Sequence, residues 1–335
     1  MADDERPENR TAARRLCWIY PDRGTAEQRE MEARNVWDGY RAVAGDLGLE
    51  MSLHKPEEIA IDARDPRRPR FYLNGDQVTP EDTIFVTYLY SLPHQAPDVA
   101  NQVMLYTNLE QAGFYLPIPP RIAYIGRDKL ATMLFLADCP VPALPSVRIG
   151  TGRSAMSAHY DIALSGLTYP LIVKPAYWGM GLGTSVVTNI HDLRGVIGMA
   201  GGADVPVVVQ PYFENVSEGR VYVIDGKPHT ILRGRKEGYC MMAVRATGGK
   251  IHREYLDSLP ELEEAVAYAA RRLRTAYFTL DFLHDGERYW IHEIEPDGAV
   301  GFSQNADQGD VAYRVIHDRF AAYLRGHDAF LKDRA

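Results

Sequence analysis

Long apolar runs, clustered cysteines and an excess of basic side chains are all missing from this sequence of 335 residues. No window approaches the roughly 18 apolar residues of a membrane span, and the charged N-terminus does not resemble a signal peptide. The three cysteines, Cys17, Cys139 and Cys240, show no CxxC spacing, so neither a disulfide framework nor a zinc knuckle is indicated. We therefore expect a cytoplasmic protein with no membrane partner.

The charge balance argues against polyanionic partners. Lysine and arginine number 37 against 45 acidic residues, a formal net charge of −8, which disfavours nucleic acid as the main partner. Hydrophobic residues make up 46% and charged residues 24%, as in ordinary globular proteins, and the length suits about two to three domains. We expect small-molecule partners, bound where a few cations are concentrated; a homodimer is left open.

The chain reads as a small open α/β domain followed by two further units. Strands and helices are expected to alternate in the first part, at 16–20, 25–47, 49–53, 71–78, 83–90 and 98–112. A helical pattern at 127–137 ends in a proline-dense stretch, which marks a domain border. We expect domains at 1–125, 126–204 and 205–335, the last containing a helix at 259–276 with Pro260 early in it and Ser258 as its cap.

Three carboxylates lie inside otherwise apolar strands near the C-terminus. Asp281, Glu293 and Glu295 would be costly there unless they are paired or bind cations. If Gly286 takes the left-handed conformation in a three-residue loop, Asp281 opposes Tyr289 and the three carboxylates share one face of the sheet. A two-residue loop would place Asp281 on the opposite face. The three-residue alternative predicts a hard-oxygen site suited to Mg²⁺, whereas solvated acids on an exposed strand remain the rival interpretation.

A lysine and a glycine-rich loop form a second group of interest. Lys174 follows an apolar strand pattern, and Gly179, Gly181 and Gly183 come shortly after it. Backbone amides in such a loop can cradle phosphate oxygens, with a lysine as point charge. The motif is neither a Walker loop nor a Rossmann fingerprint, because a strand and not a helix follows. We interpret it as a flap over phosphates, although an ordinary hairpin turn would have the same pattern.

The segment 205–220 joins a strand to a loop and back. Gln210, Tyr212 and Phe213 stand where backbone and apolar groups can hold an adenine, and Glu218 can accept ribose hydroxyls. Core packing would explain Tyr212 and Phe213 equally well. Arg220 is harder to explain as a purely structural residue.

Taken in order, these features resemble the ATP-grasp superfamily, and within it the branch of ribosomal-protein glutamate ligases and related peptide ligases. The resemblance covers about residues 122–325. Its landmarks are the Arg127-Asp128-Lys129 helix start, Val173-Lys174, the GMGLG loop, the QPYF hinge, Glu218-Gly219-Arg220, Arg235-Lys236-Glu237-Gly238, Asp281 and Glu293-Ile294-Glu295. It implies an ATP-grasp fold of α/β (α+β) class, in which an N-terminal open α/β domain precedes two α+β subdomains that clasp ATP.

The resemblance also implies roles for individual residues. Lys129 and Lys174 would contact the nucleotide phosphates beneath the glycine flap, while the hinge would hold adenine and Glu218 the ribose. Asp281, Glu293 and Glu295 would hold two Mg²⁺ ions, with Mn²⁺ as an alternative. The family's chemistry is attack of a carboxylate on the γ-phosphate of ATP, followed by capture of the acyl phosphate by an amine.

Two departures from the family pattern matter. The metal motif usually ends in asparagine, where this chain has Glu295. An arginine two residues before the metal aspartate in D-alanine:D-alanine ligases is replaced here by Thr279, which argues against that subgroup. Another cation must then hold the acyl phosphate. The candidates are Arg220, Arg233, Arg235 and Arg245, of which we favour Arg220 and Arg245 as catalytic residues.

The sequence therefore predicts an ADP-forming carboxylate–amine ligase that acts on amino acids or small peptides in biosynthesis. An ATP-grasp phosphotransferase and a non-catalytic ATP-binding regulatory protein are the alternatives. The carboxylate and amine substrates stay open. Tyr88, Tyr90 and His94 follow a strand end, where open α/β sheets commonly bind ligands. Structural roles for these residues are the competing interpretation.

Overall fold

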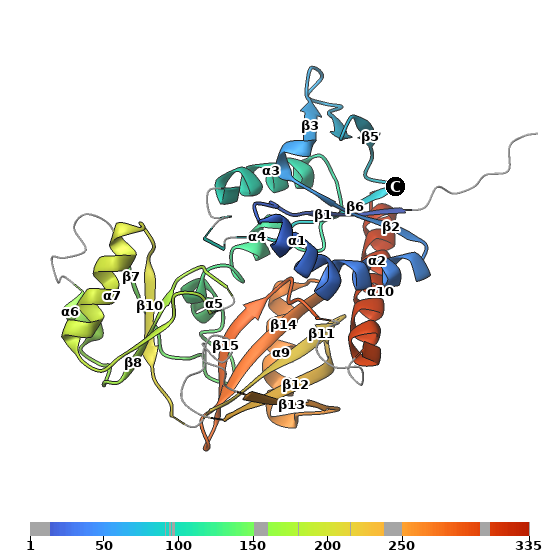
Figure 1. The fold of residues 1–335 in the computed structure, drawn as a ribbon. Helices are drawn as coiled ribbons and strands as arrows, with labels where there is room; N and C mark the ends of the chain where they lie inside the picture. Colours follow the sequence, from blue (N-terminus) through green and yellow to red (C-terminus); the bar gives the residue numbers. More distant parts are fainter. Residues whose placement is uncertain are drawn as a thin grey trace, which may run out of the picture.

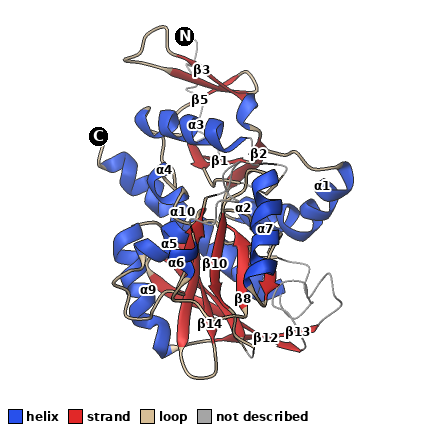
Figure 2. Cartoon of the chain, turned by 90° about the vertical axis from the view of Figure 1, so that its left-hand side faces the viewer, coloured by secondary structure: helices blue, strands red, loops and turns tan. Residues whose placement is uncertain are grey.

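The computed structural model describes residues 14–90, 92–93, 95, 98–150, 160–179, 181–214, 216–237, 250–301 and 309–334. Three units are visible in Figure 1: an N-terminal unit, a smaller unit drawn in green and yellow, and a C-terminal sheet in orange. Figure 2 shows the same units from the side, with the N-terminal unit above the C-terminal sheet. No helix in these ranges is long and apolar enough to span a bilayer.

The N-terminal unit is organised around a parallel sheet with the strand order β2-β1-β6. Its strands are β1 (Arg14–Ile19), β2 (Leu49–His54), β3 (Ile59–Asp62), β4 (Arg70–Leu73), β5 (Asp76–Val78) and β6 (Thr83–Val86). Its helical segments are α1 (Ala26–Glu32), η1 (Ala33–Trp37), α2 (Asp38–Asp46), η2 (Pro56–Glu58), α3 (Val99–Gln111) and α4 (Pro120–Ala123). The expected strands and helices are present, with 71–78 forming a hairpin of β4 and β5 in a separate antiparallel sheet β3-β4-β5. A π-helical turn at η1 divides the long helical pattern.

The second unit contains an antiparallel sheet with the order β7-β10-β8-β9. Its elements are β7 (Val147–Ile149), α6 (Asp161–Leu164), β8 (Leu171–Pro175), β9 (Ser185–Val187), α7 (Ile190–Gly202) and β10 (Val207–Pro211). The preceding helix, α5 (Lys129–Phe135), packs against the C-terminal sheet through Met133 and Phe135. Since β10 lies between β7 and β8, its pairing favours a boundary after β10 over the expected boundary at 204. A strand inside a sheet cannot belong to the next unit.

The C-terminal unit is a five-stranded antiparallel sheet with the order β13-β12-β11-β14-β15. Its elements are β11 (Ser217–Ile224), β12 (Lys227–Glu237), β13 (Lys250–Leu256), α9 (Pro260–Leu273), β14 (Tyr277–His284) and β15 (Tyr289–Glu295). The apolar face of α9 packs on this sheet through Leu262, Val266, Ala269 and Leu273. The expected Ser258 cap is wrong: Leu259 occupies the N-cap position, without a side-chain hydrogen bond.

The last helix, α10 (Gly309–Lys332), returns to the N-terminal unit. Its buried face joins the core that contains β1 and β6, through Val315, Ile316 and Phe320. Figure 1 shows this helix, in red, running from the orange sheet toward the blue strands. Helix α10 therefore packs against both the N-terminal unit and the C-terminal sheet, and connects the first and third units.

The hairpin β14–β15 differs from the expected register. Four residues, 285–288, form the loop, and Leu283 pairs with Trp290. Gly286 has the expected positive φ of 105°. A bulge follows, so that Asp281 pairs directly with Glu293, and the predicted opposition of Asp281 and Tyr289 is wrong. Because the bulge restores the alternation, Asp281 and Glu293 still lie on the same face.

Candidate active site

An arginine and two carboxylates form the centre of the site. Arg220 on β11 is the direct cross-strand partner of Asp281 on β14. Its Nε and Nη2 donate to the two carboxylate oxygens of Asp281 at 2.8 and 2.7 Å, and Nη2 also lies 2.6 Å from Oε2 of Glu295. The guanidinium therefore bridges two of the three predicted metal ligands.

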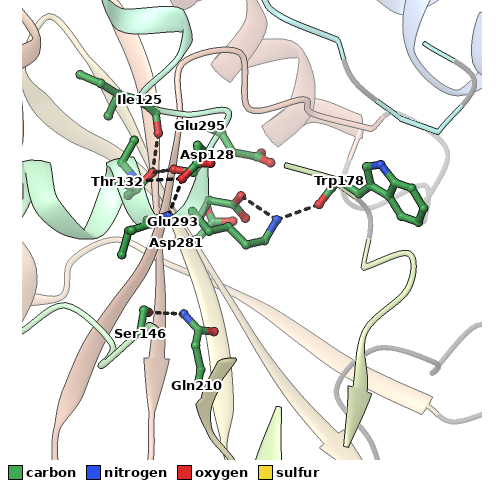
Figure 3. Close-up of polar contacts among 12 residues, drawn as sticks. Ile125, Asp128, Thr132, Ser146, Trp178, Gln210, Asp281, Glu293 and Glu295 are labelled. Carbon is green, nitrogen blue, oxygen red and sulfur yellow. Dashed lines mark hydrogen bonds and ion pairs between the residues drawn. The ribbon is translucent and has the colours of Figure 1, made fainter. Parts of the chain in front are cut away.

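The third carboxylate, Glu293, is approached by two lysines. Lys129 begins α5, where Asp128 caps the helix, and its Nζ lies 3.8 Å from Oε1 of Glu293. The same ammonium group donates to the Trp178 carbonyl at 2.7 Å (Figure 3). Lys174 on β8 is 4% exposed and is one of the charges that lower the pKa of Glu293. Both expected phosphate ligands thus lie near the sheet face that bears Asp281, Glu293 and Glu295, which we call the carboxylate face.

Burial dominates the protonation behaviour of this face. It raises the pKa of Asp281 to about 7, with repulsion from Glu295 and Glu293 adding to the shift and Arg220 opposing it. Burial also raises the pKa of Glu293, against the lowering effect of Lys129 and Lys174. Burial thus outweighs the nearby cations in setting the pKa values of Asp281 and Glu293.

The donor set fits Mg²⁺ chemically, because three carboxylates on one face supply hard oxygen ligands. In the part of the chain that the structure describes, no group of three or more His, Cys, Asp or Glu side chains is arranged as a ready-made metal site. Arg220 lies between Asp281 and Glu295 and holds oxygens that a metal ion would need. Metal binding at this face therefore requires exchange of guanidinium contacts for metal contacts.

The glycine loop connects the antiparallel strands β8 and β9, as expected of a hairpin flap. Gly181 and Gly183 have φ of 71° and 74°, a conformation that only glycine adopts readily. Gly179 lines a cavity together with Arg220 and Glu295. The loop is thus close to the bridged carboxylates.

The hinge residues Gln210, Tyr212 and Phe213 differ in their surroundings. Gln210 on β10 is 1% exposed and donates from Nε2 to the Ser146 hydroxyl at 2.8 Å (Figure 3). Its Oε1 is buried and accepts no hydrogen bond from the residues that the structure describes. Phe213 stacks on Trp290, with ring centroids 5.9 Å apart. Tyr212 is half-buried at the strand end. Gln210 therefore offers an unused acceptor, whereas Phe213 has a packing role.

Glu218 and Arg220 line a polar cavity of about 340 Å³ with Asp281 and His292. The arginine candidates do not all face it. Arg233 pairs with Gly219, so it projects from the opposite face of the sheet, where it binds Glu254 at 2.6 Å. Arg245 and His94 lie outside the described residues, as does the side chain of Arg235.

A second cavity, of about 360 Å³, lies between the N-terminal unit and the carboxylate face. Tyr88 and Tyr90, whose role was open, both line it. Arg127 lines the cavity too. Its sequence position had indicated only the start of a helix, and no role in binding was predicted for it. Its proximity in sequence to Lys129, a predicted phosphate ligand, could have indicated that Arg127 also lies near the site.

Comparison with known proteins gives a short sequence match. No family model matches the chain. A curated D-alanine–D-alanine ligase of a Nitratiruptor species is 29% identical over 103 residues, 30% of this chain. The match spans 28% of that relative's length.

Similar solved structures extend over nearly the whole chain. A D-alanine–D-alanine ligase from Bacillus anthracis complexed with ATP aligns at a TM-score of 0.63, with 15% identity, 95% of this chain and 99% of the other. The ATP-grasp ligase PsnB, complexed with a minimal precursor, aligns at 0.59 with 17% identity, covering 92% and 98%. The D-cycloserine synthetase DcsG aligns at 0.59 with 16% identity, covering 93% and 99%. This chain has the fold of the ATP-grasp ligases, which confirms the expected fold class.

Proposed function

We propose that the protein is an ATP- and Mg²⁺-dependent carboxylate–amine ligase that releases ADP and phosphate. The observation that carries the proposal is the convergence of Arg220, Lys129 and Lys174 on the face that bears Asp281 and Glu293. Phosphoryl transfer depends mainly on positioning and charge neutralisation, which buried cations and carboxylates on one face can provide.

The nucleotide is held at the boundary of the second and third units. Lys129 and Lys174 contact its phosphates, and the loop with Gly179, Gly181 and Gly183 covers them. The unused Oε1 of Gln210 suits the amino group of adenine. Glu218 suits a ribose hydroxyl because it lines the cavity beside Arg220. Tyr212 and Phe213 contribute apolar contacts at the hinge.

Asp281, Glu293 and Glu295 are the residues that would hold Mg²⁺, which neutralises phosphate charge when bound. A carboxylate oxygen of the substrate attacks the γ-phosphorus, the bond to the ADP oxygen breaks, and ADP leaves. The amine nitrogen then attacks the acyl carbon, the carbon–oxygen bond breaks, and phosphate leaves as the amine proton passes to solvent. Arg220 stabilises the negative charge of the acyl phosphate; Arg245 is the second candidate for this role.

The proposal is tested by measuring ADP release with pools of carboxylic acids and amines, with mass spectrometry of the products. ADP formation that needs both substrates, together with an amide product, is the expected result. A phosphorylated alcohol would indicate a phosphotransferase instead. ATP binding without turnover over the whole panel would leave the regulatory alternative.

A matched pair of variants links turnover to the carboxylate face. Glu293→Gln removes one charge from the buried face, and turnover should fall by at least about a hundredfold, as expected for loss of a metal ligand. Glu287→Gln makes the same change in the exposed loop between β14 and β15 and should leave turnover unchanged. Undiminished activity of Glu293→Gln would sink the metal assignment.

A further inference from the structure

The cavity of about 360 Å³ above the carboxylate face has an aromatic wall and a charged end. Its volume is within the range of roughly 300–1,000 Å³ typical of small-molecule sites. Aromatic residues of the N-terminal unit line one side, among them Tyr20, Trp37 and Tyr40, and Arg127, Gly179 and Glu295 line the end near the carboxylates. It is therefore continuous with the place where the proposed phosphoryl transfer occurs.

The aromatic wall is a rigid cluster of rings from β1, η1, α2 and the segment after β6. Tyr20 lies edge-on to Trp37 at 5.4 Å and to Tyr90 at 4.7 Å between ring centroids. Trp18 contacts Trp37 at 5.7 Å and is fully buried. Rings held in edge-to-face contact present a preformed surface on which a further aromatic ring packs favourably.

Hydrogen bonds fix the polar atoms of this wall. The Trp18 indole donates to the Tyr90 hydroxyl at 2.9 Å, and that hydroxyl donates to Asp297 at 2.9 Å. Asp297 is also bound by Arg319, whose side chain is fully buried. Tyr20 donates to Glu32 at 2.7 Å. The hydroxyls of Tyr20 and Tyr90 and the Asp297 carboxylate are thus hydrogen-bonded within the protein, so these two tyrosines present mainly ring surface to a ligand.

Arg127 provides positive charge at the charged end of the cavity. Its Nε and Nη2 are buried, and neither has a hydrogen-bond partner among the residues that the structure describes. Arg220, in contrast, is bound by Asp281 and Glu295. Burial raises the pKa of Tyr88, and Arg127 is close enough to oppose that shift. Burying these two nitrogens without partners among the described residues is costly, and a carboxylate that accepts hydrogen bonds from both of them removes that cost.

We propose that this cavity binds the carboxylate substrate, and that this substrate is an aromatic carboxylic acid of amino-acid size. The inference rests on the proposed ligase function and deepens it. The carboxylate is held by Arg127 beside Gly179 and Glu295, where one oxygen can reach the transferred phosphoryl group. The aromatic group lies against the rings of Trp37, Tyr20 and Tyr40. Small, acidic and basic amino acids leave the wall unfilled or bring charge to it.

The experiment uses hydroxylamine as a general amine. It displaces phosphate from an acyl phosphate to form a hydroxamate, which gives a coloured complex with ferric ions, so the natural amine need not be known. Phenylalanine, tyrosine and tryptophan are compared with alanine, glutamate and lysine, each with MgATP. At least tenfold higher kcat/KM for an aromatic acid is the expected result. Preference for alanine, glutamate or lysine would overturn the inference and leave the ligase function standing.

A binding arm separates the two proposals. Calorimetry with the same acids in the presence of MgADP reports occupancy of the cavity without turnover. Binding of an aromatic acid without any ADP release would contradict the ligase function and support the cavity assignment. Neither binding nor turnover with any aromatic acid would contradict the cavity assignment.

Two variants connect the selectivity to the cavity. Val36→Trp fills the half-buried wall without removing a core side chain and should raise KM for the aromatic acid at least tenfold. Arg127→Met should raise the same KM at least tenfold, with the Kd for ATP changed less than about twofold. Val103→Trp and Arg121→Met make the same changes at exposed positions and serve as controls. Unchanged KM in both cavity variants would refute the proposal.

Discussion

Arg220 and Asp281 face each other across β11 and β14 and are joined by two hydrogen bonds of 2.8 and 2.7 Å. The same guanidinium reaches Glu295 at 2.6 Å. A single guanidinium group therefore bridges two of the three carboxylates that would hold Mg²⁺. In the proposed function, Mg²⁺ bound to these oxygens would replace part of the Arg220 contacts and leave the guanidinium available to the acyl phosphate.

Replacement of Arg220 by methionine should destabilise the protein and make its stability depend on divalent metal. Loss of one partner of a buried ion pair costs about 3–5 kcal/mol; because the Arg220 side chain is 22% exposed, we expect about 2 kcal/mol. Mg²⁺ should restore part of this loss, since it supplies the missing positive charge. Chemical denaturation with and without Mg²⁺ measures both effects.

Arg233→Met is the matched control for that experiment. Arg233 lies on the other face of the same sheet and binds Glu254, with side-chain exposures of 37% and 55%. Exposed pairs contribute about 0–1 kcal/mol, so the variant should lose little stability and show no gain from Mg²⁺. Equal Mg²⁺ responses of the two variants would contradict the role given to Arg220.

Asp281 and Glu293 share a face as predicted, although the three-residue loop on which that prediction rested is wrong. The bulge between Ile291 and Glu293 inserts one residue and restores the alternation that the four-residue loop would have shifted. Bulges depend on how a strand packs against its neighbours. A pattern read along one strand therefore cannot locate them.

The aromatic cavity could not be predicted, for a different reason. Trp18, Trp37, Tyr88 and Arg127 are far apart in the chain, and each has an ordinary local environment in the sequence. Only the packing of β1, η1 and the start of α5 brings them to one cavity. Local patterns indicated the phosphate and metal residues because those lie in short motifs. The substrate end depends on contacts between units.

Lys174→Ala should weaken ATP binding by roughly ten- to a hundredfold. The ammonium group is almost fully buried on β8, and a charge-assisted hydrogen bond to phosphate contributes about 1.5–3 kcal/mol. Calorimetric titration with a non-hydrolysable ATP analogue measures the affinity. Lys227→Ala, at an exposed position that begins β12, should change it less than about twofold. An unaltered affinity for Lys174→Ala would refute its phosphate role.

Two glycines of the flap should differ in their tolerance of alanine. At Gly183, φ is 74° and a Cβ atom would lie 2.8 Å from the Pro175 ring and 3.3 Å from Trp178. The left-handed conformation alone costs alanine roughly 1–2 kcal/mol. Gly183→Ala should therefore raise KM for ATP about tenfold through a displaced flap.

Gly179→Ala provides the comparison, because a Cβ atom there meets nothing within 4 Å. We expect its KM for ATP to stay within about twofold of the parent. ADP-release assays on both variants decide the matter. Equal tolerance at the two positions would show that the flap geometry does not govern nucleotide binding.

Divalent metal should bind more tightly as the pH rises toward and past neutrality. Burial raises the pKa of Asp281 to about 7 and raises that of Glu293, so protons compete with metal at these oxygens below the raised values. Metal ligation requires the ionised carboxylates, and each proton displaced changes the apparent affinity by about tenfold per pH unit. The affinity should therefore rise between about pH 5.5 and 7.5 and then level off. Spin resonance titration with Mn²⁺, in the absence of nucleotide, measures it. Glu287→Gln should show the same pH profile as the parent, and a flat profile in the parent would contradict the assignment of Asp281 and Glu293 as metal ligands.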